Sequence, residues 1–237
     1  MRIAVIPARG GSKRIHKKNI RLFCGRPIIA YSIAAAIEAN LFDHVIVSTD
    51  DDEIAEAARS HGAEVPFVRP SNLADDFTGT NAVVAHAVLW YRDRGYSIDH
   101  TCCIYATAPM LDASYLREGL RILMEREKTF AFSITSFPFP IQRAVRLLAS
   151  GGIEPTEPHH MTTRSQDLET LYHDAGQFYW GTAEAFVENR PLFAPHSAGV
   201  VIPRHMVQDI DTIEDWERAE LMYIAWRGTK SPGRPPD

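Results

Sequence analysis

The chain has 237 residues, of which 45% are hydrophobic and 23% are charged, so it can bury a full globular core. Its formal net charge of −5 argues against a general binder of nucleic acids or of anionic membranes. We expect a cytoplasmic protein, because no apolar run approaches the ~18 residues of a membrane span and no secretory signal is recognisable. The three cysteines fit this location, and because they lack metal-ligand spacing we interpret them as packing residues.

Strand and helix patterns alternate along the first 136 residues. Apolar β-branched runs predict strands at 3–6, 44–47, 64–68, 100–105 and 130–134. Apolar residues at helical spacing predict helices at 28–39, 52–61, 80–94 and 114–126, the third of them capped by Thr80. This order predicts an α/β fold with a mostly parallel sheet and helices on both faces. Ligands of such sheets lie beyond the carboxyl ends of the strands.

The alternation stops between residues 137 and 172, a stretch rich in proline, glycine and polar residues. We interpret it as an inserted arm. Strands are expected again at 177–180 and 199–202, followed by a helix from Thr212 to about Trp226, whose start has a capping-box pattern with Asp215. We expect one domain over residues 1–227 and a disordered tail over residues 228–237.

The loop after the first strand is the most informative segment. It contains Gly10 and Gly11, whose backbone N–H groups can approach an anion closely, and five cations: Arg9, Lys13, Arg14, Lys17 and Lys18. This pattern predicts a site for a nucleoside triphosphate. The loop matches neither G-x-x-x-x-G-K-[ST] nor G-x-G-x-x-G, so an ATPase P-loop and a dinucleotide fingerprint are both excluded. The alternative is a solvated basic loop at the end of a strand.

A second candidate site is the D-x-D pair Asp209 and Asp211, just before the last helix. In an extended segment both carboxylates face one side and Ile210 faces the other. Paired carboxylates suit Mg²⁺, with phosphate oxygens and water completing its shell. The alternative is a pair of acids at the start of a helix.

Weaker candidates lie elsewhere at strand ends and in the arm. Arg69 ends a predicted strand, and the hydroxyls of Thr78 and Thr80 lie near a helix start, although the local pattern favours a polar loop with a helix cap. Arg164 can hold a carboxylate in a bidentate fork. The histidines 159, 160 and 173 have no spacing that indicates a transition-metal site.

These motifs, with Val47-Ser48-Thr49-Asp50 and Arg69-Pro70, occur in the order found in the CMP-sialic acid synthetases. The chain resembles this family of cytidylyltransferases, which activate nine-carbon and related acidic sugars, from Ile3 to about Trp226. The resemblance implies a Rossmann-like three-layer α/β/α nucleotidyltransferase fold. It also implies a homodimer in which the arm of one subunit reaches across the other.

The resemblance implies specific roles for the residues of both sites. The positions that would bind CTP are Ala8, Arg9, Gly10, Gly11, Ser12, Lys13, Lys18, Asn19, Arg69, Thr78 and Thr80. Asp209 and Asp211 would bind Mg²⁺, and together with Lys13 and Lys18 they form the expected catalytic group. The anomeric hydroxyl of the sugar would attack the α-phosphorus, helped by positioning and by neutralisation of phosphate charge.

The sugar-facing segments depart from those of ordinary sialic acid enzymes. A Q-P-T-S-P-L-R type loop is replaced by residues 105–111, without its Gln and Arg. Segments 157–160, 164–167 and 173–179 resemble the pseudaminic acid cytidylyltransferase branch, whose sugar carries a second acylated amine and a terminal deoxy carbon. The expected sugar contacts are Tyr105, Thr107, Arg164, Gln177 and Tyr179.

Three alternatives remain at this point. The same reaction could act on legionaminate, N-acetylneuraminate or a deoxy-octulosonate. A non-catalytic nucleotide-binding regulator is disfavoured because Asp209 and Asp211 are both present beside Lys13. A Rossmann-type oxidoreductase is disfavoured by the missing G-x-G-x-x-G.

Overall fold

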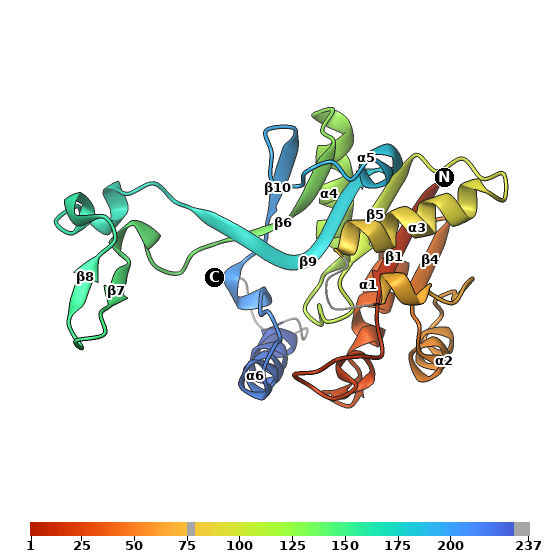
Figure 1. Cartoon of the computed structure of the whole chain (residues 1–237), viewed down its shortest axis with the longest axis horizontal. Coiled ribbons are helices and arrows are strands. Elements are labelled where there is room, and N and C mark those ends of the chain that lie inside the picture. The colour runs from red at the N-terminus through yellow and green to blue at the C-terminus, as the bar shows by residue number, and fades with distance from the viewer. Residues whose placement is uncertain (75–78, 230–237) are drawn as a thin grey trace.

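The computed structural model describes residues 1–74 and 79–229. Its centre is a six-stranded sheet in the order β10-β6-β9-β5-β1-β4 (Figure 1). The bounds of these strands, in chain order, are β1 Arg2–Pro7, β4 His44–Ser48, β5 His100–Ile104, β6 Phe130–Ser136, β9 Tyr172–Thr182 and β10 Ser197–Val201. Strand β9 is antiparallel to β5 and β6, whereas β1 pairs in parallel with β4 and β5, and β10 pairs in parallel with β6. The predicted α/β fold with a mostly parallel sheet is confirmed.

Helices cover both faces of the sheet because its central strands are apolar on both faces. In β1, Ala4 and Ile6 belong to one buried cluster and Ile3 and Val5 to another. The first cluster packs against α1 (Ile29–Ala39), α2 (Asp52–Ser60) and α4 (Ala113–Glu125), and the second against α3 (Thr80–Arg92) and α5 (Ala183–Val187). The structure therefore has three layers.

The helix starts follow local capping chemistry. Asp51 caps α2 and Asp112 caps α4 through their side chains. Before α6 (Ile213–Thr229), Thr212 and Asp215 form the predicted reciprocal capping box, with hydrogen bonds of 2.8 and 3.2 Å. The expectation that Thr80 caps its helix is wrong: Gly79 occupies the cap position and Thr80 is the first helical residue, so its hydroxyl does not close the helix.

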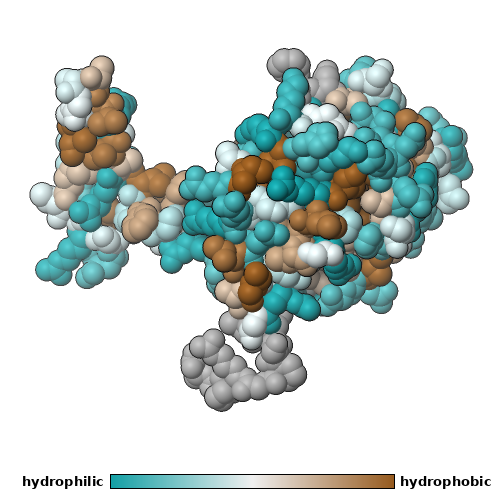
Figure 2. Space-filling model, turned by 90° about the horizontal axis from the view of Figure 1, so that it is seen from below, coloured by the Kyte–Doolittle hydropathy of each residue, from teal (hydrophilic) through white to brown (hydrophobic). Residues whose placement is uncertain are grey.

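The arm expected at 137–172 projects from the body of the molecule at the left of Figure 1. It carries a small hairpin of β7 (Val145–Leu147) and β8 (Ile153–Pro155) and three short 3-10 turns. Apolar side chains on it are exposed, including 78% of Leu147 and 69% of Ile153, and brown surface gathers there in Figure 2. An isolated two-stranded hairpin buries little apolar area.

Other segments differ from the sequence-based expectation. Residues 64–68 form only isolated bridges to β4 and its end, at Glu64 and Val68, rather than a strand. Helix α5 and the β2–β3 hairpin (Leu22–Phe23 and Arg26–Pro27) carry no strong periodic pattern and were not expected. The tail beyond residue 229 lies outside the described residues. Within 1–74 and 79–229, no helix is both long and apolar enough to cross a bilayer.

Candidate active site at the carboxyl ends of the strands

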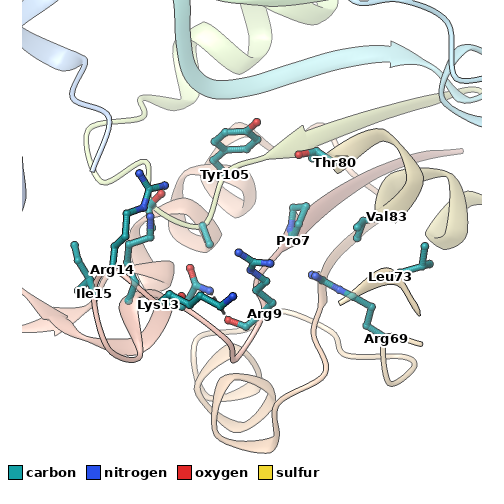
Figure 3. Close-up of a pocket in the computed structure, with 15 residues that line it drawn as sticks. Pro7, Arg9, Lys13, Arg14, Ile15, Arg69, Leu73, Thr80, Val83 and Tyr105 are labelled. Carbon is teal, nitrogen blue, oxygen red and sulfur yellow. Dashed lines mark hydrogen bonds between the residues drawn. The ribbon is translucent and has the colours of Figure 1, made fainter. Parts of the chain in front are cut away.

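A cavity of about 550 Å³ lies where β1 and β5 end and α3 begins (Figure 3). Its lining joins segments that are far apart in the sequence. It comprises Pro7, Arg9, Ser12, Lys13, Arg14, Ile15, Lys18, Asn19, Arg69, Leu73, Thr80, Val83, Tyr105, Ala106 and Thr107. Most of the predicted nucleotide-binding residues thus surround one space, at the edge of the sheet where parallel-sheet ligands bind.

The glycine-rich loop is held by hydrogen bonds to its neighbours. The backbone N–H of Gly10 donates to Asp50 Oδ1 at 3.1 Å, and Asn19 Nδ2 donates to the carbonyl of Arg9 at 3.0 Å. The N–H of Ser12 donates to the carbonyl of Gly10 at 2.9 Å, which makes a tight turn. A loop fixed in this way can receive an anion without first losing much conformational freedom.

Glycine is needed at position 10 because the loop backbone passes close to Asp51 at the start of α2. A Cβ at this position would lie 2.6 Å from Asp51 Oδ2. The same Asp51 caps α2 by accepting from the N–H of Ile54 at 2.9 Å, so it cannot easily move away. A Cβ at Gly11, by contrast, would meet no atom within 4 Å.

The loop and the D-x-D pair meet in space although they lie about two hundred residues apart. Lys18 Nζ donates to the carbonyl of Ile210 at 2.7 Å and lies 3.5 Å from Asp211 Oδ1, while Arg14 reaches the same oxygen at 2.8 Å. Ile210 is buried, as the alternation of an extended segment predicts. Burial, and next the charge of Asp211, raise the pKa of Asp209, whereas Lys18 lowers it.

Arg69 forms a buried wall of the cavity. Its Nε donates to Ser48 Oγ at 3.2 Å, and its guanidinium also donates to the carbonyl of Ser48. Burial lowers the pKa of Arg69 and the nearby Asp50 raises it. A guanidinium stays protonated even so, and this one is fixed by the end of β4.

A smaller cavity of about 260 Å³ shares Thr80 and Tyr105 with the larger one. Asp174 and Tyr179 also line it, and the Tyr179 hydroxyl donates to Asp174 Oδ2 at 2.6 Å. The other Asp174 oxygen accepts from the N–H of Gly176 at 2.9 Å. Burial, and next Tyr105 and Asp174, raise the pKa of Tyr179, so its hydroxyl stays neutral and donates.

Several sequence candidates lie away from these cavities. Gln177 is buried and donates from Nε2 to the carbonyl of Met206 at 2.6 Å. Arg164 is exposed and belongs to the arm, which projects away from the body of the molecule in Figure 1. Ala8 is buried beneath the loop, and Thr78 lies outside the described residues.

Sequence reasoning assigned no specific contact to three residues of the site. Asp50 fixes the loop through Gly10, Arg14 contacts Asp211, and Asp174 lines the smaller cavity. Asp50 lies in the loop just after the predicted strand 44–47, three residues beyond its end, and that position is a signal for a site residue. The contact of Arg14 with Asp211, and the cavity that distant segments form around Asp174, depend on tertiary packing that no local pattern reports.

Residues 3–207 match the model of a protein family described as Cytidylyltransferase. The chain belongs to the cytidylyltransferase family. Within this cytidylyltransferase the matched region covers the loop, both cavities and the arm, and ends just before the D-x-D pair.

Curated relatives resemble the chain in sequence, and a solved structure resembles it in fold. The cytidylyltransferase is 45% identical to "Pseudaminic acid cytidylyltransferase" of Campylobacter jejuni, over 93% of this chain and 95% of that one. It is 29% identical to "CMP-N,N'-diacetyllegionaminic acid synthase" of Legionella pneumophila, over 93% and 95% of the two chains. A structure titled as a CMP:2-keto-3-deoxy-manno-octonic acid synthetase complexed with CTP superimposes with a TM-score of 0.69 at 15% identity, covering 95% of this chain and 99% of that one. This last likeness shows the shared fold.

Proposed function

We propose that this cytidylyltransferase joins CTP and pseudaminic acid to give CMP-pseudaminic acid and pyrophosphate. The observation that best supports this reaction is the contact between the cationic loop and Asp211, which Arg14 and Lys18 make beside a cavity of about 550 Å³. The choice of sugar is supported by the identity to the Campylobacter jejuni relative, 45% against 29% for the legionaminic acid synthase.

The chemistry requires no covalent intermediate with the protein. The anomeric hydroxyl oxygen of the sugar bonds to the α-phosphorus, the bond from that phosphorus to the bridging oxygen of the β-phosphate breaks, and pyrophosphate leaves with the electron pair. The hydroxyl proton passes to water. Arg9, Lys13 and Lys18 bind the triphosphate and balance the charge that develops on it, and positioning supplies much of the remaining rate.

We assign the nucleoside half of CTP to the side of the cavity formed by Arg69 and Thr80. Both residues line the cavity, and Arg69 is fixed by Ser48 so that it keeps one orientation. Thr78 remains a candidate from the sequence. The fixed guanidinium suits a hydrogen-bond acceptor such as a base carbonyl or ribose oxygen.

Asp209 and Asp211 are suited to Mg²⁺. Their carboxylates are hard oxygen donors, and the pKa of Asp209 is raised by burial and next by the like charge of Asp211, a repulsion that a cation would relieve. Arg14 and Lys18 already contact Asp211, which marks the position as one that attracts positive charge. When bound, Mg²⁺ would neutralise phosphate charge during the transfer.

We assign the sugar to the smaller cavity. It adjoins the larger one at Thr80 and Tyr105, which supports a sugar position next to the α-phosphate. Tyr179 uses its one O–H on Asp174, so both residues offer acceptor oxygens, which suit the amide N–H groups of a diacylated sugar. We assign the sugar carboxylate to Arg164, and in a homodimer this arginine would come from the partner subunit.

A substrate panel tests the proposal. The protein is incubated with CTP, Mg²⁺ and, in turn, pseudaminate, legionaminate, N-acetylneuraminate and a deoxy-octulosonate, and pyrophosphate is measured. Release should be fastest with pseudaminate and absent when CTP is replaced by ATP. Preference for another of these sugars would refute the sugar assignment, and no release with any of them would refute the enzyme assignment.

A further inference from the structure

Three side chains with metal-binding atoms converge on the arm, outside the site described above. They are Glu157, His159 and His160, at the short turn η4 (Pro158–His160), and one donor atom from each lies within 4.8 Å of the other two. Glu157 Oε2 is 3.6 Å from His160 Nε2 and 3.9 Å from His159 Nε2. These separations are longer than ordinary hydrogen bonds, so direct hydrogen bonding does not explain the convergence.

The backbone beneath these side chains is well defined. The N–H of His160 donates to the carbonyl of Glu157 at 3.0 Å, and the N–H of Met161 donates to that of Pro158 at 3.2 Å. Pro158 fixes its own φ at the first position of the turn. A turn fixed in this way loses little backbone freedom when its side chains bind one ion.

The two imidazoles lie close together, with ring centroids 4.0 Å apart and planes tilted by 46°. This is closer than the usual 4.5–7 Å of aromatic pairs. Around a tetrahedral ion with bonds of about 2.1 Å, donor atoms stand about 3.4 Å apart. The spacings of 3.6 and 3.9 Å thus contract only slightly to surround an ion. Because His159 is 69% exposed, its ring can turn freely.

We propose that Glu157, His159 and His160 form a binding site for one divalent transition-metal ion, of which Zn²⁺ is the simplest example. Two imidazole nitrogens and one carboxylate are a donor set that Zn²⁺ takes in proteins, with a fourth position left for water or another group. Mg²⁺ avoids such nitrogen donors. The site therefore differs in kind from Asp209 and Asp211, and it does not depend on the proposed reaction.

Bound metal would close the turn that precedes Arg164. The ion links residues 157, 159 and 160, and the hydrogen bond from the N–H of Thr163 to the carbonyl of His160, at 3.2 Å, continues the chain toward Arg164. The site then stiffens the part of the arm that carries this arginine. Hydrogen exchange over residues 157–164 should slow when the ion is added.

Titration with Co²⁺ in excess Mg²⁺ tests the proposal directly. We expect one Co²⁺ per chain, with the strong visible bands of a tetrahedral site that disappear on adding Zn²⁺. His159→Gln, His160→Gln and Glu157→Gln should each weaken binding at least about 10-fold. His61→Gln, a histidine at the end of α2 away from the arm, is the matched control and should bind as the wild type does.

Two further comparisons decide the outcome. A variant carrying both Asp209→Asn and Asp211→Asn should retain the tetrahedral Co²⁺ bands, because the carboxylate pair is a separate site. The three arm variants should keep the wild-type Tm without metal, since none of the three side chains is buried: the exposed fractions are 46% for Glu157, 69% for His159 and 29% for His160. Wild-type protein that binds Co²⁺ without tetrahedral bands, or arm variants that bind it as tightly as wild type, would overturn the proposal.

Discussion

At the scale of single residues, Asp211 connects the two halves of the proposed site. It contacts Arg14 at 2.8 Å and Lys18 at 3.5 Å, and its side chain is 32% exposed. Exposed ion pairs of this kind contribute about 0–1 kcal/mol to stability. Charge at a phosphoryl-transfer site affects the rate far more. The residue is therefore expected to matter for catalysis rather than for folding.

We predict that Asp211→Asn lowers kcat roughly 100-fold, the scale of losing one charged group aimed at a transition state. Its Tm should stay close to that of the wild type. Pyrophosphate release and a thermal melt measure the two effects. Glu214→Gln, an exposed acid in the first turn of α6, is the control and should change neither. Equal losses in the control, or full activity in Asp211→Asn, would remove Asp211 from the site.

Asp209 should show a conflict between stability and function. Its pKa is raised in the folded chain by burial and by Asp211, so folding favours the protonated carboxyl. The stabilising effect of protonation is complete below the ordinary aspartate pKa of about 3.9 and is lost as the pH rises through the raised value. At neutral pH the ionised Asp209 therefore weakens the fold.

We predict that Asp209→Asn raises Tm slightly at pH 7, by about 1–2 °C because the side chain is partly exposed and water screens the repulsion. The gain should disappear as the pH falls toward 4. Activity should drop at the same time. Melts across this pH range check the sign, and a variant that is less stable than wild type at pH 7 would contradict it.

At the scale of elements, the glycine-rich loop depends on its contact with the start of α2. A Cβ on Gly10 would overlap Asp51, so either the α2 cap or the loop must shift. We predict that Gly10→Ala lowers the free energy of unfolding by about 1–3 kcal/mol and raises the KM for CTP. Gly11→Ala has open space and should stay within about 0.5 kcal/mol of the wild type in urea unfolding. Equal stability of the two variants would refute the close-approach argument.

Elements with strong local patterns could be predicted from the sequence. Strand β1 reads as the apolar run 3–6 because both its faces are buried, and α6 begins with a capping box that is visible in Thr212 and Asp215. The loop cations and the D-x-D pair could also be recognised locally. Their contact through Lys18 could not, because it depends on how the last helix packs back onto the sheet.

Strand β9 shows where local patterns fail. Its pairing with β6 shifts register between Phe132 and Ile134, and Ser133 Oγ accepts from the N–H groups of Gln177 and Phe178, both at 3.2 Å. The extra residues lie in β9, where Gly176 has a φ of +61° and Gln177 is buried. Ser133 of the neighbouring strand accepts the N–H groups that lose their ladder partners, so the alternation along β9 alone does not report which of its residues face a ligand.

At the scale of the whole molecule, the sites and the arm are spatially separate. The two cavities lie at the strand ends. Arg164 belongs to the arm, residues 137–172, which projects from the body of the molecule in Figure 1. The exposed Leu147 and Ile153 give the arm an apolar surface that a second copy of the chain can cover. An arm that contributes Arg164 to the active site of the partner subunit explains both the separation from the cavities and the exposed apolar side chains. This arrangement predicts an effect that requires a dimer.

We predict that two inactive variants restore each other's activity when mixed. Lys13→Ala impairs triphosphate binding by the loop but leaves the arm intact. Arg164→Ala impairs the arm but leaves the loop intact. Where the arm acts across a two-fold axis, each mixed dimer contains one site with both an intact loop and an intact arm. After exchange of subunits at a 1:1 ratio, half of the dimers are mixed, so about a quarter of wild-type activity should return. Light scattering confirms the dimer, and variants each carrying both substitutions provide the inactive control. If the mixed dimer recovers no activity, Arg164 does not act in the active site of the partner subunit.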